Sequence, residues 1–258
     1  SMARVEVSFE LDADALLTVT ALLSFAPIAI LAAIAGIAPS SLAQSFNLMG
    51  FLPSQSVSKL NGLSADGTVA AGYDDPIAQG FTWTAAAGRN NFGSASASPT
   101  VVNGMSGNGL TVVGNSVDRA FKWSQAGGFV NLGVLPGYQS SSARDANHDG
   151  SIVVGTLSNG SGSEPQAFRW TQATGMQGLG FGTRAEAISG DGSKIFVCVD
   201  DKVYQLPYSA TSLPATPIIT HLFYGLDVHP YTGEIWGLDA GNYNESGKII
   251  LLDEWDAN

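Results

Sequence analysis

Charged residues and cysteine are scarce in this chain of 258 residues. Only 13% of the residues are charged, and the 11 basic residues lie scattered singly among 22 acidic ones. A protein that binds nucleic acid needs clustered Lys and Arg to neutralise phosphates, so this pattern excludes nucleic acid as a partner. The single cysteine, Cys198, excludes an internal disulfide and a cysteine-based zinc site. It lies in the apolar run of residues 195–199, which favours a buried structural thiol over a nucleophile.

Short motifs that mark common active sites are also missing. The sequence has no G-x-S-x-G elbow, no H-E-x-x-H zinc motif and no phosphate-binding glycine loop. Its three histidines, His148, His221 and His229, lack metal-type spacing. These absences favour a protein that is not an enzyme, and they leave enzyme classes without such motifs open.

Glycine, in contrast, is abundant, and five of the 31 glycines recur at intervals of 41 or 42 residues. Each lies in a similar short turn, as in Ser64-Ala-Asp66-Gly67; the five are Gly67, Gly109, Gly150, Gly192 and Gly233. A period near 42 with strand-type residues around each turn is typical of propeller blades of four strands. We therefore expect an all-β fold in which residues 44–258 form a five-bladed β-propeller.

The strands of one blade follow from alternation and turn residues. In the third repeat they are predicted at residues 142–146, 151–155, 166–171 and 176–180. At the N-terminal end, residues 46–53 match residues 129–136, which hold the fourth strand of the second repeat, whereas the fifth repeat stops after its third strand. The first strand is therefore expected to complete the last blade and close the ring.

Two stretches resemble families of exported propellers. The segments RAFKWS (119–124) and QAFRWT (166–171), with GMQGLG (175–180) and LPG (135–137), resemble the extracellular HAF-repeat family of bacteria over residues 46–182. The histidine of that family is replaced here by Gln79, Arg119 and Gln166. The last repeat, YGLDVHPYTGEIW (224–236), is similar to secreted YncE-like propellers. Both resemblances imply an exported β-propeller, and neither implies an established activity.

The N-terminal segment is of a different kind. Residues 15–38 carry no charge and are followed by the small residues Ser41 and Ala43. This pattern predicts that residues 1–43 are a signal peptide cleaved after Ala43 or, alternatively, an uncleaved membrane anchor. Residues 4–20 also resemble a strand pair from the substrate-binding domain of DnaK-type chaperones, with Ala15 in place of the turn glycine. We expect the propeller to be secreted, extracellular or periplasmic.

One set of polar residues recurs with the same period. Six positions before each turn glycine lies a polar residue, and these five are Asn61, Asn103, Arg144, Glu186 and Asp227. Each follows an apolar residue that is expected to pack on the other face of the strand: Leu60, Val102, Ala143, Ala185 and Leu226. On the inner strands of a propeller the polar residues would form a ring at one height of the channel. Two interpretations are open: the ring binds a small polar ligand or a sugar, or its side chains satisfy one another and channel waters.

A weaker pattern suggests calcium. Asp145, Asn147 and Asp149 follow the D-x-N-x-D-G form of a calcium loop, but Thr156 stands where such a loop requires a bidentate Glu. The turn recurs in the other repeats without an equivalent of Asp145, so hairpin geometry accounts for most of the pattern. No other cofactor is expected.

The function that these features favour is a secreted or cell-surface binding module, without catalysis, for a glycan or another surface protein. The first alternative is a glycoside hydrolase, since Glu186 and Asp227 lie on adjacent blades and glycoside hydrolysis needs two carboxyl groups. The second alternative is a structural scaffold without a ligand. Contact with a membrane is expected only through residues 15–38, if these are not cleaved.

Overall fold

The computed structural model consists of strands and turns in the parts of the chain that it describes. These are residues 4–11, 15–22, 57–75, 79–92, 99–160, 165–182, 184–199, 202–210, 213–218, 225–228, 235–239 and 248–251. No helix occurs among them, which confirms the all-β class. The chain divides into two compact units, Ser1–Phe46 and Asn47–Asn258.

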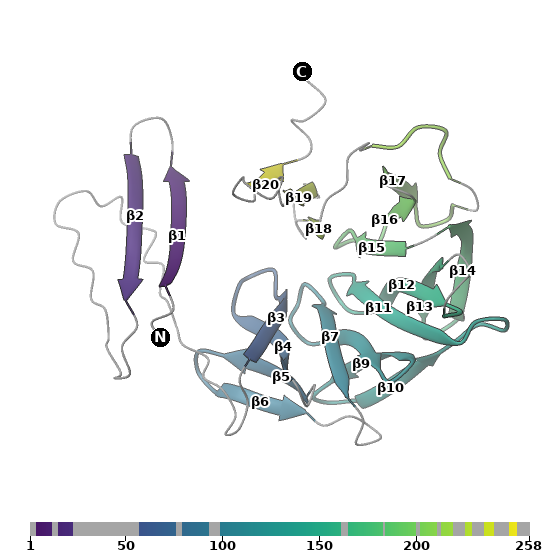
Figure 1. The fold of residues 1–258 in the computed structure, drawn as a ribbon. Helices are drawn as coiled ribbons and strands as arrows, with labels where there is room; N and C mark the ends of the chain where they lie inside the picture. The colour runs from purple at the N-terminus through teal and green to yellow at the C-terminus, as the bar shows by residue number, and fades with distance from the viewer. Residues whose placement is uncertain are drawn as a thin grey trace. The chain divides into compact units, whose positions relative to one another are not determined.

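The first unit contains one antiparallel strand pair. Strand β1 (Arg4–Leu11) pairs with β2 (Ala15–Leu22) in an unbroken register from Arg4↔Leu22 to Leu11↔Ala15 (Figure 1). The chaperone-like stretch therefore forms the strand pair that its resemblance implies. In the described part of the chain, no helix is both long and apolar enough to span a membrane. Residues 23–56 lie outside the described residues, so cleavage of residues 1–43 stays a prediction.

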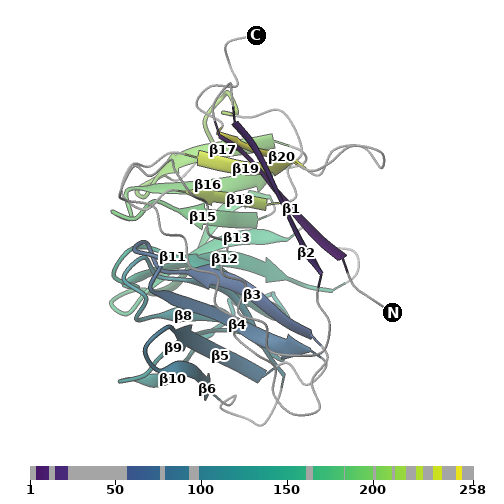
Figure 2. The same cartoon turned by 90° about the vertical axis from the view of Figure 1, so that its left-hand side faces the viewer.

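The second unit contains separate antiparallel sheets, each of consecutive strands. Three of the described sheets have four strands. These are β3 (Val57–Leu63), β4 (Val69–Asp75), β5 (Gln79–Thr84) and β6 (Gly88–Phe92); β7 (Thr100–Met105), β8 (Val112–Ser116), β9 (Arg119–Ser124) and β10 (Gly128–Gly133); and β11 (Ser140–Ala146), β12 (Ile152–Ser158), β13 (Gln166–Thr171) and β14 (Gly175–Gly182). Figure 2 shows β3, β4, β5 and β6 in this order across one sheet.

Two further described sheets have three strands each. They are β15 (Arg184–Ile188), β16 (Lys194–Val199) and β17 (Lys202–Pro207), and β18 (Gly225–Val228), β19 (Ile235–Asp239) and β20 (Lys248–Leu251). Residues 46–53, which are predicted to complete the last blade, lie outside the described residues. The blade count and the closure of the ring therefore stay predictions.

The turn glycines account for the sharp reversal between the first and second strands. Gly67, Gly109, Gly150 and Gly192 have φ values of 71°, 73°, 70° and 73°, a left-handed conformation that residues with a Cβ rarely adopt. In each turn a Ser or Asn side chain caps the start of the second strand, as Ser64 Oγ does by accepting from the Val69 amide at 2.9 Å. The turn that contains Gly233 lies outside the described residues.

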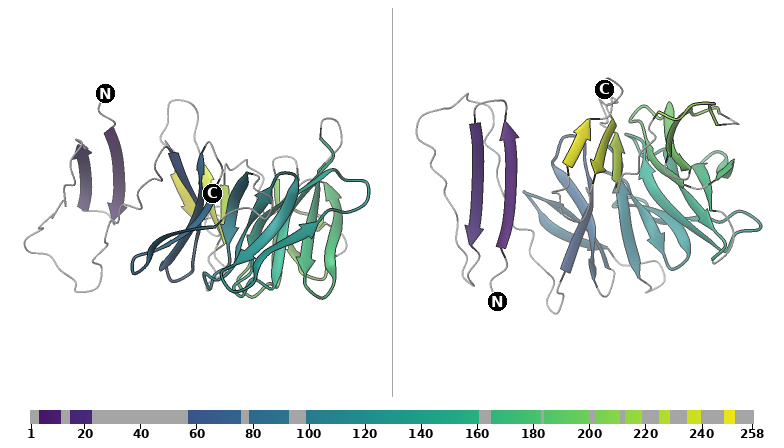
Figure 3. Two further views of the ribbon diagram at one scale, coloured as in Figure 1. Left: turned by 90° about the horizontal axis from the view of Figure 1, so that it is seen from below. Right: turned by 45° about the horizontal axis from the view of Figure 1, so that its top comes forward.

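Neighbouring sheets pack face to face in chain order. The first strand of each sheet contacts that of the next, from β3 to β7, β11, β15 and β18, and Figure 1 shows these strands innermost, with the later strands of each sheet lying outward. The two views of Figure 3 show the same sheets as separate layers. Phe168, in the predicted strand 166–171, and its counterpart Phe81 in β5 are fully buried in the core, and Phe121 in β9 is nearly so. Burial of such aromatic rings supplies much of the packing energy.

Candidate functional site

The polar ring predicted from the sequence coincides with a repeated backbone irregularity. In each of the first four sheets, the pairing of the first two strands shifts by one residue at the ring position, so Asn61, Asn103, Arg144 and Glu186 are all β-bulge residues. A bulge leaves its extra residue without a cross-strand partner and re-aims its side chain. Asp227 in β18 pairs directly with Trp236 without such a shift.

In three of the four bulged sheets, a glycine stands opposite the residue just before the bulge. Gly114 stands opposite Val102, just before the bulge, and a Cβ added to it would lie 2.0 Å from the carbonyl oxygen of Val101. Gly72 and Gly155 occupy the same place in the first and third sheets. A Cβ added to them would lie 2.0 Å from the carbonyl oxygen of Lys59 and 2.1 Å from that of Ser142. In these three sheets the bulged strand lies so close to its neighbour that only glycine fits there. In the fourth sheet Val197 stands opposite Ala185 beside the same bulge, so the bulge itself does not require a glycine.

The apolar residues before the ring positions pack mostly as predicted. Val102, Ala143 and Ala185 are 0% exposed. Leu60 is an exception, because it is 45% exposed. It belongs to the first sheet of the series, which has no described sheet before it to pack against, so the expected burial of Leu60 is wrong for this structure.

The two asparagines of the ring connect neighbouring sheets. Asn61 Nδ2 donates to the carbonyl oxygen of Val102 at 2.8 Å, and Asn103 Nδ2 donates to that of Ala143 at 2.8 Å. Asn103 Nδ2 also lies 3.0 Å from Ser142 Oγ. Because each bond joins the first strand of one sheet to that of the next, these amide groups have a structural role.

The charged members of the ring form a cluster with a residue that the sequence argument did not include. Glu186 lies between two guanidinium groups, with its carboxylate oxygens 3.9 Å from Arg144 Nε and 3.7 Å from Arg184 Nε. The side chains of Arg144, Glu186 and Arg184 are 37%, 25% and 53% exposed. The predicted partner Asp227 lies in β18, and β18 contacts β15, the strand of Glu186. The side chain of Asp227 is outside the described set, so the separation of the two carboxyl groups stays untested.

The predicted calcium ligands accept hydrogen bonds from the backbone. Asp145 bonds the amides of Ala146 (2.7 Å) and Ile188 (2.9 Å), the latter in the next sheet. Asn147 Oδ1 accepts from Ile152, and Asp149 Oδ1 accepts from Ser151. Hydrogen bonds from the Ser151 hydroxyl and amide hold the pKa of Asp149 below its ordinary value. Among the residues that the structure describes, no group of three or more His, Cys, Asp and Glu side chains could hold a metal ion.

The thiol of Cys198 lies in β16 opposite Arg184. It forms no disulfide and is partly buried, and burial raises its pKa to about 11. Since the thiolate is the reactive form, this environment agrees with a structural thiol and not with a nucleophile.

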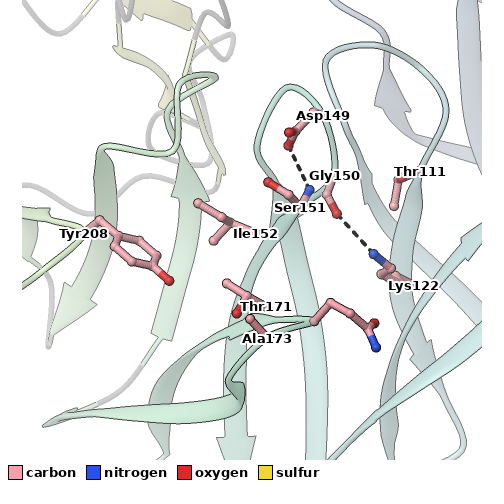
Figure 4. Close-up of a pocket in the computed structure, with 10 residues that line it drawn as sticks. Thr111, Lys122, Asp149, Gly150, Ser151, Ile152, Thr171, Ala173 and Tyr208 are labelled. Carbon is pink, nitrogen blue, oxygen red and sulfur yellow. Dashed lines mark hydrogen bonds between the residues drawn. The ribbon is translucent and has the colours of Figure 1, made fainter.

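The structure also contains a surface pocket that sequence reasoning missed. It has a volume of about 630 Å³ and is lined by Thr111, Lys122, Asp149, Gly150, Ser151, Ile152, Thr171, Gln172, Ala173 and Tyr208 (Figure 4). Lys122 Nζ lies 3.4 Å from the Gly150 carbonyl oxygen and 5.0 Å from the centre of the Trp170 ring. Because the lining comes from three sheets, no local sequence pattern marks it.

Comparison with solved structures supports a β-propeller fold. No known family model matches the sequence, and no curated protein matches it. The putative TolB from Agrobacterium tumefaciens aligns with a TM-score of 0.54 at 14% identity, over 77% of this chain and 78% of that chain. A chain of the nidogen/laminin complex aligns with a TM-score of 0.54 at 11% identity, over 80% of this chain and 79% of that chain. Both are β-propeller-type proteins, and at these identities the likeness concerns the fold alone.

Proposed function

We propose that this chain is an exported β-propeller of the HAF-repeat type that acts as a binding module without catalysis. In this proposal, five blades close into a ring, and residues 46–53 supply the last strand of the fifth blade. The fivefold turn repeat, the propeller-type neighbours and the apolar segment 15–38 support it. The partner is a glycan or another surface protein.

The proposal rests on a difference in bonding between the asparagines of the ring and its charged residues. Asn61 and Asn103 bond the backbone of the next sheet, so the fold uses them. Arg144, Glu186 and Arg184 contact one another only at 3.7–3.9 Å, and these distances are longer than hydrogen bonds. Charged groups on innermost strands that contribute little to the fold are suited to contact a ligand.

The test is a binding screen with the purified full chain on a glycan array and on immobilised surface proteins. We expect a hit that is lost in Arg144→Gln and Arg184→Gln and is retained in Lys202→Gln, which changes an exposed charge on β17. A hit that all three variants retain would place binding elsewhere. The absence of any hit in both screens would support the scaffold alternative.

A second candidate function is glycoside hydrolysis by Glu186 and Asp227. It is favoured by the contact between β15 and β18, which places these two residues on neighbouring strands. The variants Glu186→Gln and Asp227→Asn separate the two functions. Hydrolysis of a bound glycan should vanish in both, whereas a module without catalysis releases no reducing sugar even as the native chain.

A further inference from the structure

Arg144 and Arg184 differ from three other arginines of the described chain in the hydrogen bonds that their side chains make. Arg89 bonds the fully buried carboxylate of Asp74 and lies 3.7 Å from the Phe81 ring centre. Arg119 donates to the carbonyl oxygens of Asp118 (2.9 Å) and Gln139 (2.6 Å). Similarly, Arg169 donates to Gln177 Oε1 and to the Tyr208 carbonyl oxygen. These three guanidinium groups are engaged in holding the fold together.

Arg144 and Arg184 have no comparable bonds. Within the described part of the chain, the ion pair of each is with Glu186, at 3.9 and 3.7 Å. The Nε atom of Arg144 is buried without a hydrogen-bond partner there. Since a guanidinium carries five N–H donors in a planar fork, the two side chains offer paired donors that the fold does not use.

A buried hydroxyl group lies in the same region of the fold. Thr156 is only 9% exposed, and its Oγ1 has no hydrogen-bond partner among the described residues. The equivalent residue in the preceding sheet, Asn115, accepts from Ser142 of the next first strand at 3.2 Å. In the following sheet the place of Ser142 is taken by Arg184, and β12, the strand of Thr156, contacts β15, the strand of Arg184. A buried polar group without a partner is a group that a ligand could satisfy.

The charge of the cluster selects among anions. Two guanidinium groups face one carboxylate, so the cluster has a single positive charge in excess. A ligand with one carboxylate neutralises this charge and matches the planar guanidinium fork. A phosphate monoester carries a charge of about −1.5 to −2 near neutral pH, and the Glu186 carboxylate would repel it.

We infer that Arg144, Arg184 and Thr156 form a binding site for the carboxylate group of a small molecule or a sugar acid, next to Glu186. This inference rests on the proposed function, because it assigns a ligand class to the same polar ring. Glu186 limits the site to ligands with one negative charge, and Thr156 supplies a hydroxyl for a second polar group of the ligand.

Isothermal titration calorimetry of the full chain at low ionic strength tests the inference. The probes are D-glucuronate, acetate, D-glucose and inorganic phosphate. We expect glucuronate to bind more tightly than glucose and phosphate, with an affinity that falls as NaCl is added. Acetate shows whether the carboxylate alone is sufficient or the sugar ring contributes; either result supports a carboxylate site.

Variants identify the groups responsible. Arg144→Gln and Arg184→Gln should each weaken glucuronate binding about tenfold or more, the effect of losing a charge-assisted hydrogen bond. Lys202→Gln, which removes an exposed charge two strands from Arg184 in the same sheet, should change the affinity far less. Glu186→Gln should strengthen glucuronate binding and allow inorganic phosphate to bind, because the repelling carboxylate is removed. Arg184 is the more exposed arginine, so its variant is expected to fold even if Arg144→Gln does not.

Three results would overturn the inference. They are tighter binding of phosphate than of glucuronate, equal binding of glucose and glucuronate, and no binding of glucuronate by the native chain. If one of these occurs while the glycan or protein screen still gives a hit that Arg144→Gln abolishes, the carboxylate assignment fails and the binding module stands. If the screens are also negative, both proposals fail.

Discussion

At the residue scale, the acidic residues of the turns are held in their ionised form by local hydrogen bonds. Asp66 accepts from the Ser64 hydroxyl and from the Thr68 amide and hydroxyl, and these bonds lower its pKa to about 2. Asp191 has the same arrangement, with bonds from the Ser189 hydroxyl and from Ser193 and with a pKa of about 2. Both carboxylates are solvent-exposed, so their pKa values are lowered by the hydrogen bonds of the turn and not by burial.

A pH dependence of stability follows from these two residues. A carboxyl group whose pKa is lower in the folded than in the unfolded chain contributes stability above its unfolded pKa and loses it as the pH falls through its folded pKa. We therefore expect stability to decline as the pH falls from about 4 toward about 2. Urea unfolding followed by tryptophan fluorescence at several pH values measures this. A double variant, Asp66→Asn with Asp191→Asn, should show a flatter profile, and an unchanged profile would contradict the assignment.

At the scale of the strand, the bulge and the glycine opposite it form one unit. Gly114→Ala would place its Cβ 2.0 Å from the Val101 carbonyl oxygen, and backbone on both sides limits how far the strands can move apart. We expect a loss of about 3 kcal/mol in the free energy of unfolding, the upper end of the range for overpacking. Gly127→Ala is the matched control, since its Cβ would meet only the flexible Ser124 Oγ, at 3.0 Å. Equal effects in urea unfolding would show that the close approach does not matter.

A second prediction at this scale concerns the bond between the third and fourth sheets. Asp145 accepts from the amide of Ile188, a residue that is almost completely buried. Asp145→Ala leaves this amide unpaired, so the free energy of unfolding should fall by about 2 kcal/mol. Asp118→Ala, at an exposed position, should have little effect. Denaturant titrations give the free energies of unfolding that test this prediction. It is wrong if Asp145→Ala is as stable as the native chain.

At the scale of the whole molecule, the sheets follow one another in a series whose first strands are in contact. The proposed closure of this series is testable through the N-terminal segment. Counted back from the Leu-Pro pair at 52–53 and at 135–136, Met49 corresponds to Leu132, which is buried in β10, and Leu48 corresponds to the exposed Asn131. The two positions should therefore respond differently if residues 46–53 occupy the fourth strand of the last blade.

We expect Met49→Ala to lower the free energy of unfolding by about 2 kcal/mol or more, because closure would bury Met49 as Leu132 is buried in β10, and we expect the same loss for Leu132→Ala. Leu48→Ala should have little effect. Thermal and urea unfolding of the three variants measure this. An open chain of sheets predicts that neither Met49→Ala nor Leu48→Ala changes stability, and that result would exclude closure through this segment.

Much of the fold was accessible from local patterns. Four of the five turn glycines have positive φ, and the four strands of the third repeat lie where they are predicted, with bounds that differ by up to three residues. Positive φ and two-residue alternation are requirements of neighbouring residues, so a local pattern reveals them. Four of the five predicted ring positions coincide with bulges, because a bulge recurs with the repeat. The sequence patterns did not show that these positions are bulges, since the bulge depends on how two strands pair.

The amino-acid sequence by itself determined that this chain repeats a four-stranded β unit, and which residues recur at each place in the unit. The tertiary structure alone decided which ring residues are tied to the backbone, that Arg184 joins Arg144 around Glu186, and that three sheets line a pocket beside Lys122. The physical reason is distance along the chain: Asn61 reaches the carbonyl oxygen of a residue 41 positions later. Such contacts depend on how successive sheets pack, which no pattern within one repeat records.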